Sequence, residues 1–155
     1  MVSASKEAMQ LPEIMRLYSD DSSMGKTTFS NQIKYIYLCH GRSSPYIKVP
    51  LNDRKKIISI DHFGKEDKYK DFEGEVLVKE AIEKIILLEF DEKERLLIGV
   101  INKIDEYLEF WKTTKITEDN HKLVSETLEQ STKLIKLRDS IEKLVSEEKT
   151  VKEMG

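Results

Sequence analysis

The longest helical pattern in this chain covers residues 75–148, and it decides the fold class. Hydrophobic residues recur there every three or four positions, as they do along one face of an α-helix. All three prolines (Pro12, Pro45 and Pro50) precede this stretch, and Gly99 is the only glycine within it. The chain lacks the alternation of hydrophobic and polar residues that is typical of half-buried strands. We therefore predict an all-α fold.

The pattern divides into about five helices, the last of which is long. We expect these helices near residues 29–40, 51–63, 75–90, 91–112 and 117–148. Gly41 and Gly64 follow the first two segments, and glycine commonly ends a helix. Asp91, with Glu94 at the third position after it, is the sequence pattern of a capping box at the start of the fourth helix.

A chain of 155 residues can bury a sizeable core, and we predict a single helical domain over residues 1–155. Its N-terminal segment, residues 1–28, is expected to be partly loose, with a polar loop at 19–28. Residues 29–63 should form an aromatic helix–turn–helix, and residues 75–148 should form the long helices.

The C-terminal helices are expected to pack on one another. The helices at 75–90 and 91–112 should form an antiparallel central pair, with the last helix along them. The last helix carries a hydrophobic seam, interrupted by polar Thr127 and Gln130, that suits packing against a helix of the same chain or of a neighbour. The residues of this seam are Leu123, Leu134, Leu137, Ile141 and Leu144.

Composition and charge narrow the possible partners. Charged residues make up 35% and hydrophobic residues 39%, a balance that suits a soluble helical protein with wide solvated faces. The net charge of -3 argues against a nucleic-acid partner, because phosphate contacts need a basic surface. A single cysteine, Cys39, excludes an intramolecular disulfide and fits a reducing compartment. The longest apolar run, Ile85–Leu88, is far shorter than the ~20 residues that span a bilayer, so no membrane contact is expected.

No residue pattern predicts catalysis or a cofactor. Gly25-Lys26-Thr27 invites a nucleotide-binding interpretation, but Asp20 occupies the position where a phosphate-binding loop needs its first glycine. Cys39 and the three histidines lack the spacings of a metal site. Neighbouring carboxylates alternate with lysines, as on solvated helix faces. We therefore expect a protein that is not an enzyme and has no cofactor and no metal.

Aromatic residues and arginines gather around the turn at residues 41–50. Two of the five arginines, Arg42 and Arg54, flank Tyr46. Because aromatic residues and arginine are enriched in binding hot spots, we predict that Arg42, Tyr46 and Arg54 contribute to a protein interface. For the two arginines, binding of turn carbonyls is an equal alternative. Tyr37 shares the hydrophobic face of its helix, and we expect it in the core.

The succession of Tyr35-Ile36-Tyr37, Ser44-Pro45-Tyr46, Pro50-Leu51 and Arg54 resembles a set of small helical proteins of tailed bacteriophages. That set belongs to the virion structural gene block, including the block of crAss-like phages. The resemblance covers residues 30–63. It implies a non-enzymatic structural or assembly protein, such as a portal or head-to-tail connector component, made in the host cytoplasm and located in the virion. Its partners would be other phage structural proteins and further copies in a homo-oligomer.

A different class of function stays open, namely a small cytosolic regulatory or host-takeover protein that binds a host factor or nucleic acid. A clustered lysine face would favour it, although acidic residues at positions 66, 67 and 71 dilute the candidates. These candidates are Lys55, Lys56, Lys65, Lys68 and Lys70. The size and stoichiometry of the purified protein, alone and with its genetic neighbours, would separate the two classes.

Overall fold

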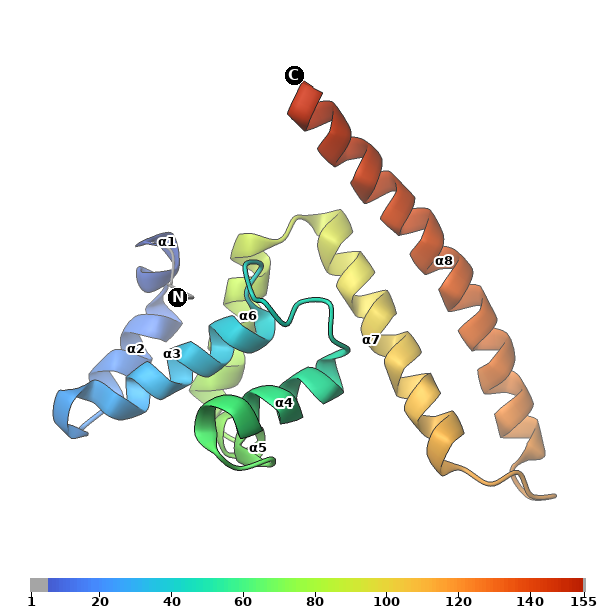
Figure 1. Ribbon diagram of the computed structural model, residues 1–155, viewed down its shortest axis with the longest axis horizontal. Helices are drawn as coiled ribbons and strands as arrows, with labels where there is room; N and C mark the ends of the chain where they lie inside the picture. The colour runs from blue at the N-terminus through green and yellow to red at the C-terminus, as the bar shows by residue number, and fades with distance from the viewer. Residues whose placement is uncertain (1–5, 155) are drawn as a thin grey trace. The chain divides into compact units, whose positions relative to one another are not determined.

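The computed structural model describes residues 6–154, and every regular element in that range is a helix (Figure 1). It has eight α-helices and one short 3-10 helix, η1, within the described residues. The all-α prediction is therefore confirmed, whereas the expected count of about five helices is too low. The chain divides into two compact units, Met1–Phe90 and Asp91–Gly155, each with its own hydrophobic core. The single domain over residues 1–155 stays a prediction.

The first unit contains all the helices but two. They are α1 (Lys6–Met9), α2 (Pro12–Asp20), η1 (Met24–Lys26), α3 (Thr27–His40), α4 (Leu51–Phe63), α5 (Lys68–Glu73) and α6 (Val76–Glu89). The helices predicted at 29–40, 51–63 and 75–90 correspond to α3, α4 and α6. The sequence pattern did not predict α2 and α5.

Helix α2 lies in the segment that was expected to be partly loose. Pro12 occupies its first turn, where the missing N–H of proline costs nothing and its fixed φ favours the helix. Ile14 and Leu17, three positions apart, then point into the core and are almost completely buried. Residues 1–5 lie outside the described part of the chain.

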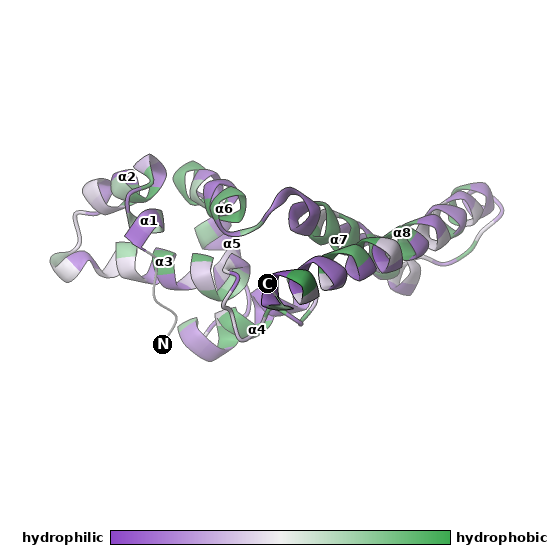
Figure 2. Ribbon diagram, turned by 90° about the horizontal axis from the view of Figure 1, so that it is seen from above, coloured by the Kyte–Doolittle hydropathy of each residue, from purple (hydrophilic) through white to green (hydrophobic). Residues whose placement is uncertain are grey.

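Helix α3 is covered on several sides. Five consecutive residues, Tyr35 to Cys39, are all buried, and Tyr37 is among them as expected. Helix α6 packs against α3 and α2, and α4 and α5 pack against α3. Figure 2 shows hydrophobic residues around much of α6, which supplies Val78, Ala81 and Ile85 to the core.

Two glycines end helices where the sequence predicts. Gly64 follows α4 with φ of 72°, a left-handed conformation that side chains other than glycine seldom adopt. Gly41 follows α3, and its N–H donates to the carbonyl of Tyr37 at 3.0 Å. A Cβ at Gly41 would lie 2.6 Å from that carbonyl oxygen, so the chain can turn there only with glycine.

The second unit is an antiparallel pair of helices, α7 (Glu92–Thr113) and α8 (His121–Met154), which lie side by side in Figure 1. The capping box is confirmed: the Glu94 N–H donates to Asp91 Oδ1 at 2.9 Å, and the Asp91 N–H donates to Glu94 Oε1 at 3.3 Å. Helix α8 begins and ends later than predicted. Asn120 holds the preceding turn, because its Oδ1 accepts from the Thr117 N–H at 2.7 Å.

Two side-chain contacts fix the register of this pair. Lys93 forms an ion pair with Glu148, and the Tyr107 hydroxyl donates to Gln130 Oε1 at 3.4 Å. Hydrophobic side chains fill the seam between the two contacts. They are Leu97, Val100, Ile104, Leu134, Ile141 and Val145. The last helix thus packs along the 91–112 helix as predicted, while the pairing of α6 with α7 stays a prediction.

Candidate functional site

The turn at 41–50, where the interface residues were predicted, is tied to α3. Ser44 is buried, and its hydroxyl donates to the carbonyl of Leu38. The same oxygen accepts from the Tyr46 N–H at 3.1 Å. The hydrogen bonds of Ser44 therefore stabilise the conformation of the turn without a partner protein.

Arg54 binds the turn from α4. Its Nη1 donates to the Cys39 carbonyl at 2.7 Å, at the end of α3. Its Nη2 donates to the Val49 carbonyl at 2.8 Å and to the Ile47 carbonyl at 3.0 Å, and its Nε also donates to Val49 at 3.1 Å. The planar fork of arginine suits this arrangement. The structural alternative for Arg54 is thus realised, and a role in a protein contact stays a prediction.

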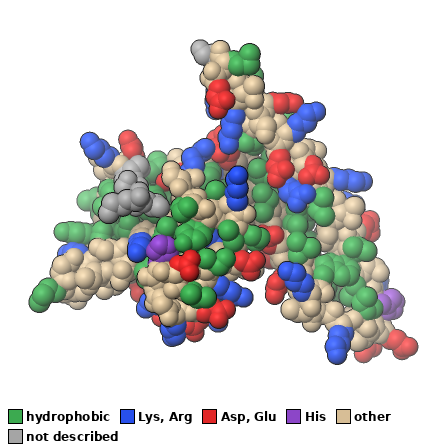
Figure 3. Space-filling view, in the orientation of Figure 1, with side chains coloured by type: hydrophobic (Ala, Val, Ile, Leu, Met, Phe, Trp, Pro, Cys, Tyr) green, Lys and Arg blue, Asp and Glu red, His purple; other side chains and the backbone are tan. Residues whose placement is uncertain are grey.

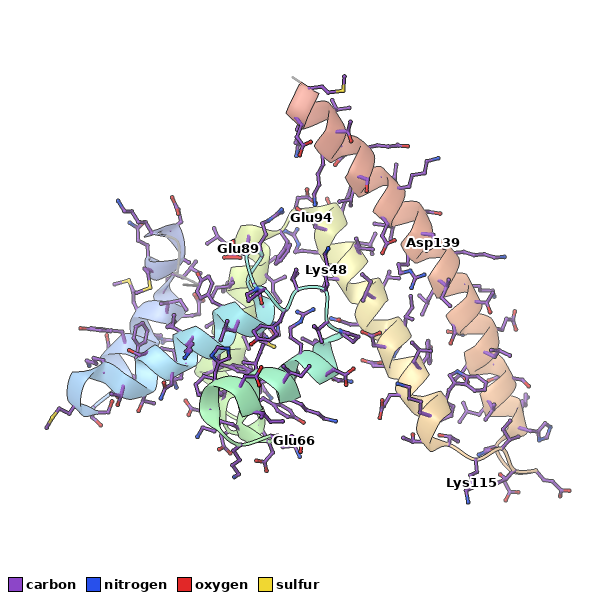
Figure 4. All side chains as sticks on the ribbon, in the orientation of Figure 1. Lys48, Glu66, Glu89, Glu94, Lys115 and Asp139 are labelled. Carbon is purple, nitrogen blue, oxygen red and sulfur yellow. The ribbon has the colours of Figure 1, made fainter. Side chains whose placement is uncertain are left out.

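Arg42 joins the other end of the turn to α6. Its Nε donates to the Glu89 carbonyl at 2.9 Å, and its backbone N–H donates to Glu89 Oε2 at 2.7 Å. Figure 4 labels Glu89 at the end of α6 and Lys48 on the turn. The guanidinium carbon lies 5.2 Å from the ring centre of Phe90, a cation–π distance. Arg42 is exposed nonetheless.

Tyr46 has more neighbours within the chain than its place on a turn suggests. It is half-buried, and its ring packs against the core of the first unit. Its hydroxyl lies 3.0 Å from His62 Nε2 and 3.4 Å from Asp61 Oδ2. Burial, and then the negative charge of Asp61, raise the pKa of Tyr46. All three predicted interface residues therefore meet at this turn, and each also binds within the first unit.

A half-buried polar cluster joins α3, α4 and α5, and it was missed by sequence reasoning. Its centre is the carboxylate of Glu73 in α5, which accepts from the Tyr35 hydroxyl at 2.6 Å and from Lys55 Nζ at 2.9 Å. His40 Nε2 lies 3.8 Å from Glu73 Oε1, close enough for an ion pair and too far for a hydrogen bond. The Tyr35–Glu73 bond spans 38 positions of sequence, and no local spacing announces it.

The surroundings shift the pKa of Glu73, His40 and Tyr35, and of the neighbouring Cys39. Burial alone would raise the pKa of Glu73, but hydrogen bonds from the neighbouring side chains outweigh it and lower that pKa to about 2. Burial lowers the pKa of His40, raises that of Tyr35, and raises that of the Cys39 thiol to about 11. A thiol with a raised pKa is a poor nucleophile, so Cys39 behaves as a core residue.

The loop at Gly25-Lys26-Thr27 uses its lysine internally. Lys26 Nζ donates to the Tyr18 carbonyl at 2.9 Å and to the Asp21 carbonyl at 2.5 Å. The Asp21 carboxylate accepts from the backbone N–H of Ser23 and of Phe29, both at 2.8 Å. It therefore occupies the N-terminal end of α3, the position in which a helix binds phosphate.

A pocket of about 340 Å³ lies beside this loop. Its acidic lining residues are Asp20, Asp21 and Glu75, and the Gln32 amide donates to Glu75 Oε2 at 2.8 Å. Negative charge in the pocket and at the end of α3 disfavours a phosphate ligand. This arrangement agrees with the sequence argument against nucleotide binding.

The hydrophobic seam predicted on the last helix is two separate rows in the structure. Leu134 and Ile141 face α7. Leu123, Leu137, Leu144 and Val151 lie beside that row and are 43–70% exposed. We call these four residues the outer stripe. Hydrophobic side chains are visible along the α7–α8 pair in Figure 3, bordered by charged ones.

Comparison with models of known protein families, with curated proteins and with solved structures gave no match. Among the described helices, none has the length and apolar character needed to cross a membrane.

Proposed function

We propose that this protein is a non-enzymatic structural or assembly protein that acts through protein–protein contacts. The observation that carries the proposal is the outer stripe. Leucine and valine recur on α8 at intervals of fourteen, seven and seven residues, yet they lie exposed beside the row that packs on α7. An apolar row with this spacing is typical of a surface that another helix covers.

The more specific proposal is a component of a tailed-phage particle, at the portal or the head-to-tail connector. It is supported by the resemblance of residues 30–63 to small phage structural proteins. Mass spectrometry of purified particles from the source of the gene tests it. Detection of the chain in a fixed ratio to the other structural proteins would support it, and absence of the chain from intact particles would overturn it.

The general proposal is tested by the mass of the assemblies that the protein forms alone and with the products of neighbouring genes. Light scattering after size-exclusion chromatography should give masses above the 18.1 kDa of one chain. Leu144→Ser should reduce these assemblies, whereas Leu128→Ser, a matched change elsewhere on α8, should not. A species of 18.1 kDa under every condition would overturn the proposal.

The regulatory alternative depended on a face of free lysines, and the contacts of those lysines weaken it. Lys55 pairs with Glu73 at 2.9 Å, and Lys65 and Lys68 each pair with an aspartate at 3.4 Å. Their charge is thus partly neutralised by carboxylates of the same unit. A surface of this kind offers little net attraction for nucleic-acid phosphates.

A further inference from the structure

We propose that the outer stripe of α8 is a dimerisation surface, covered by the α8 helix of a second copy that runs antiparallel to it. This inference rests on the proposed function and names the partner that the outer stripe binds first. Four features of the second unit support it: the register of α8, the incomplete core of the helix pair, the position of Leu96, and the charges beside the stripe.

Helix α8 follows a seven-residue repeat. The residues of α8 that are not fully exposed recur at alternating intervals of three and four. They are Val124, Thr127, Ser131, Leu134, Arg138, Ile141, Val145 and Glu148. This row faces α7. Each residue of the outer stripe from Leu123 to Leu144 comes one position before a residue of the row, as Leu144 comes before Val145. Gln130, which precedes Ser131, is the one polar residue at these positions. From Leu123 to Val151 the outer stripe runs ~42 Å at 1.5 Å per residue.

The opposite flank of the same row shows that this pattern is not shared by all of α8. There the corresponding positions are Leu128, Ile135, Glu142 and Lys149, which change from apolar to charged halfway along the helix. The outer stripe, by contrast, is apolar at every position except Gln130 from Leu123 to Val151. A helix face that is exposed to water is usually polar, whereas a continuous apolar row is typical of a face that packs against another helix.

Two helices alone leave the core of this unit incomplete. The row that faces α7 contains Thr127, Ser131 and Arg138, so the seam is only partly hydrophobic. Three of the five leucines of α8, Leu123, Leu137 and Leu144, lie instead on the outer stripe. Two such helix pairs that pack face to face would form an antiparallel four-helix bundle and would bury those leucines.

Helix α7 adds an apolar residue to the same side. Leu96 directly precedes Leu97, which packs on α8, just as Leu144 precedes Val145. In an antiparallel helix pair, the residues that directly precede such seam residues on the two helices lie on the same side of the seam. Leu96 of α7 and Leu144 of α8 therefore lie on one side of this unit. The Tyr107–Gln130 hydrogen bond joins the two helices on that side. Leu96 is 53% exposed and therefore widens the apolar surface beside the outer stripe.

The charges beside the outer stripe favour an antiparallel second copy. Lys133 and Glu147 lie in one row next to the stripe, two seven-residue repeats apart. If Leu137 of one copy lies level with Leu144 of the other, Lys133 comes within one residue, or ~1.5 Å along the helix axis, of the level of Glu147 in the other copy, twice by symmetry. A parallel pair would instead oppose lysine to lysine and glutamate to glutamate. Lys133 now pairs with Glu129 at 3.2 Å, an exposed contact of small energetic value.

The available area agrees with a stable dimer. In this register the two outer stripes overlap over residues 130–151, a length of ~32 Å. A face two helices wide then offers on the order of 650 Å² per copy, or about 1,300 Å² in total, within the range of specific interfaces.

The test is sedimentation equilibrium of the full chain, with circular dichroism to show that each variant is folded. We expect the wild type to dimerise and Lys133→Glu to raise the dimer Kd at least about tenfold. The double variant Lys133→Glu/Glu147→Lys should restore the dimer, because it exchanges the two charges. Lys149→Glu, on the opposite flank, is the matched control and should leave the Kd unchanged. Leu144→Ser should weaken the dimer, and Leu128→Ser should not.

Three outcomes would overturn the inference. A wild type that is monomeric at about 100 µM excludes the second copy as partner. If the wild type is monomeric and Leu144→Ser abolishes assembly with the products of neighbouring genes, the outer stripe binds another protein and the proposed function stands. If Leu144→Ser lowers only the melting temperature, the outer stripe is covered by other residues of its own chain. If substitutions at the outer stripe and on the opposite flank of α8 change the dimer Kd equally, the dimer forms through a different surface.

Discussion

The hydroxyl of Tyr35 donates a hydrogen bond of 2.6 Å to the carboxylate of Glu73, across 38 positions of sequence. The same carboxylate binds Lys55 at 2.9 Å, so one side chain of α5 joins α3 and α4. Helix α5 has only six residues and could not be stable by itself. The Glu73 contacts, together with the buried ring of Phe72, therefore hold it in place.

Tyr35→Phe should destabilise the first unit by about 1–2 kcal/mol, because the ring stays buried while Glu73 loses a donor. The measurement is urea unfolding followed by circular dichroism. Tyr18→Phe is the matched control, since Tyr18 is exposed and its ring contacts survive the change. Equal stability of Tyr35→Phe and wild type would show that the bond contributes nothing.

The same cluster predicts a loss of stability in acid. Burial lowers the pKa of His40 below its ordinary 6.5, so the unfolded chain takes up a proton more readily than the folded one as pH falls through 6.5. The pKa of Glu73 is about 2 instead of the ordinary 4.5, so its contribution to the free energy of unfolding is lost as the pH falls from 4.5 to 2. Unfolding free energy measured against pH should decline from near 6.5 downward. The charged groups that act on His40 are Glu73, which raises its pKa, and Lys55 and Arg54, which lower it.

His40→Gln should flatten this profile between pH 6.5 and 4.5 and leave the decline below 4.5 in place. A variant profile that matches the wild type over the upper window would mean that His40 is not the group that titrates there.

Lys26→Ala separates a structural lysine from a phosphate-binding one. Because the ammonium group binds two backbone carbonyls, we expect a loss of about 1 kcal/mol and no change in nucleotide affinity. Lys48→Ala, on the exposed turn, should stay within about 0.5 kcal/mol of wild type. Micromolar ATP binding by the wild type that disappears in Lys26→Ala would contradict this assignment.

Most of the long helices could be predicted from local spacing, and the short ones could not. Pro12 lies in the segment that was expected to be partly loose, although proline is tolerated in the first turn of a helix, as in α2. The charged segment before Glu73 has no hydrophobic period, and α5 forms because Phe72 is buried against residues far away in sequence. The spacing of hydrophobic residues along the chain cannot predict packing between residues that are far apart in sequence.

The candidate sites show the same limit. The spacing of Leu134, Leu137, Ile141 and Leu144 identifies an apolar arc on the last helix, but it does not reveal which half meets α7. That choice depends on the register set by the Lys93–Glu148 and Tyr107–Gln130 contacts. At the turn, the sequence grouped Arg42, Tyr46 and Arg54 in one candidate interface, which stays a prediction, and their partners within the chain became visible only in three dimensions.

Tyr46→Ala tests the interface prediction at the turn. We expect it to impair assembly more than it lowers the melting temperature, because Tyr46 is only half-buried. Light scattering gives the first quantity and thermal unfolding the second. Tyr37→Ala is the comparison for a fully buried ring and should cost about 3–5 kcal/mol. If Tyr46→Ala melts far below the wild type yet assembles normally when folded, Tyr46 belongs to the core.

Arg54→Lys decides between the two roles that the sequence left open for Arg54. A lysine ammonium cannot reach the carbonyls of Cys39, Ile47 and Val49 at once, so bonds that the fork now makes are lost. We expect a loss of about 2 kcal/mol in urea unfolding, with assembly preserved in the folded fraction. Arg16→Lys on the exposed face of α2 is the matched control and should stay within about 0.5 kcal/mol of wild type. Unchanged stability with lost assembly would instead assign Arg54 to a protein interface.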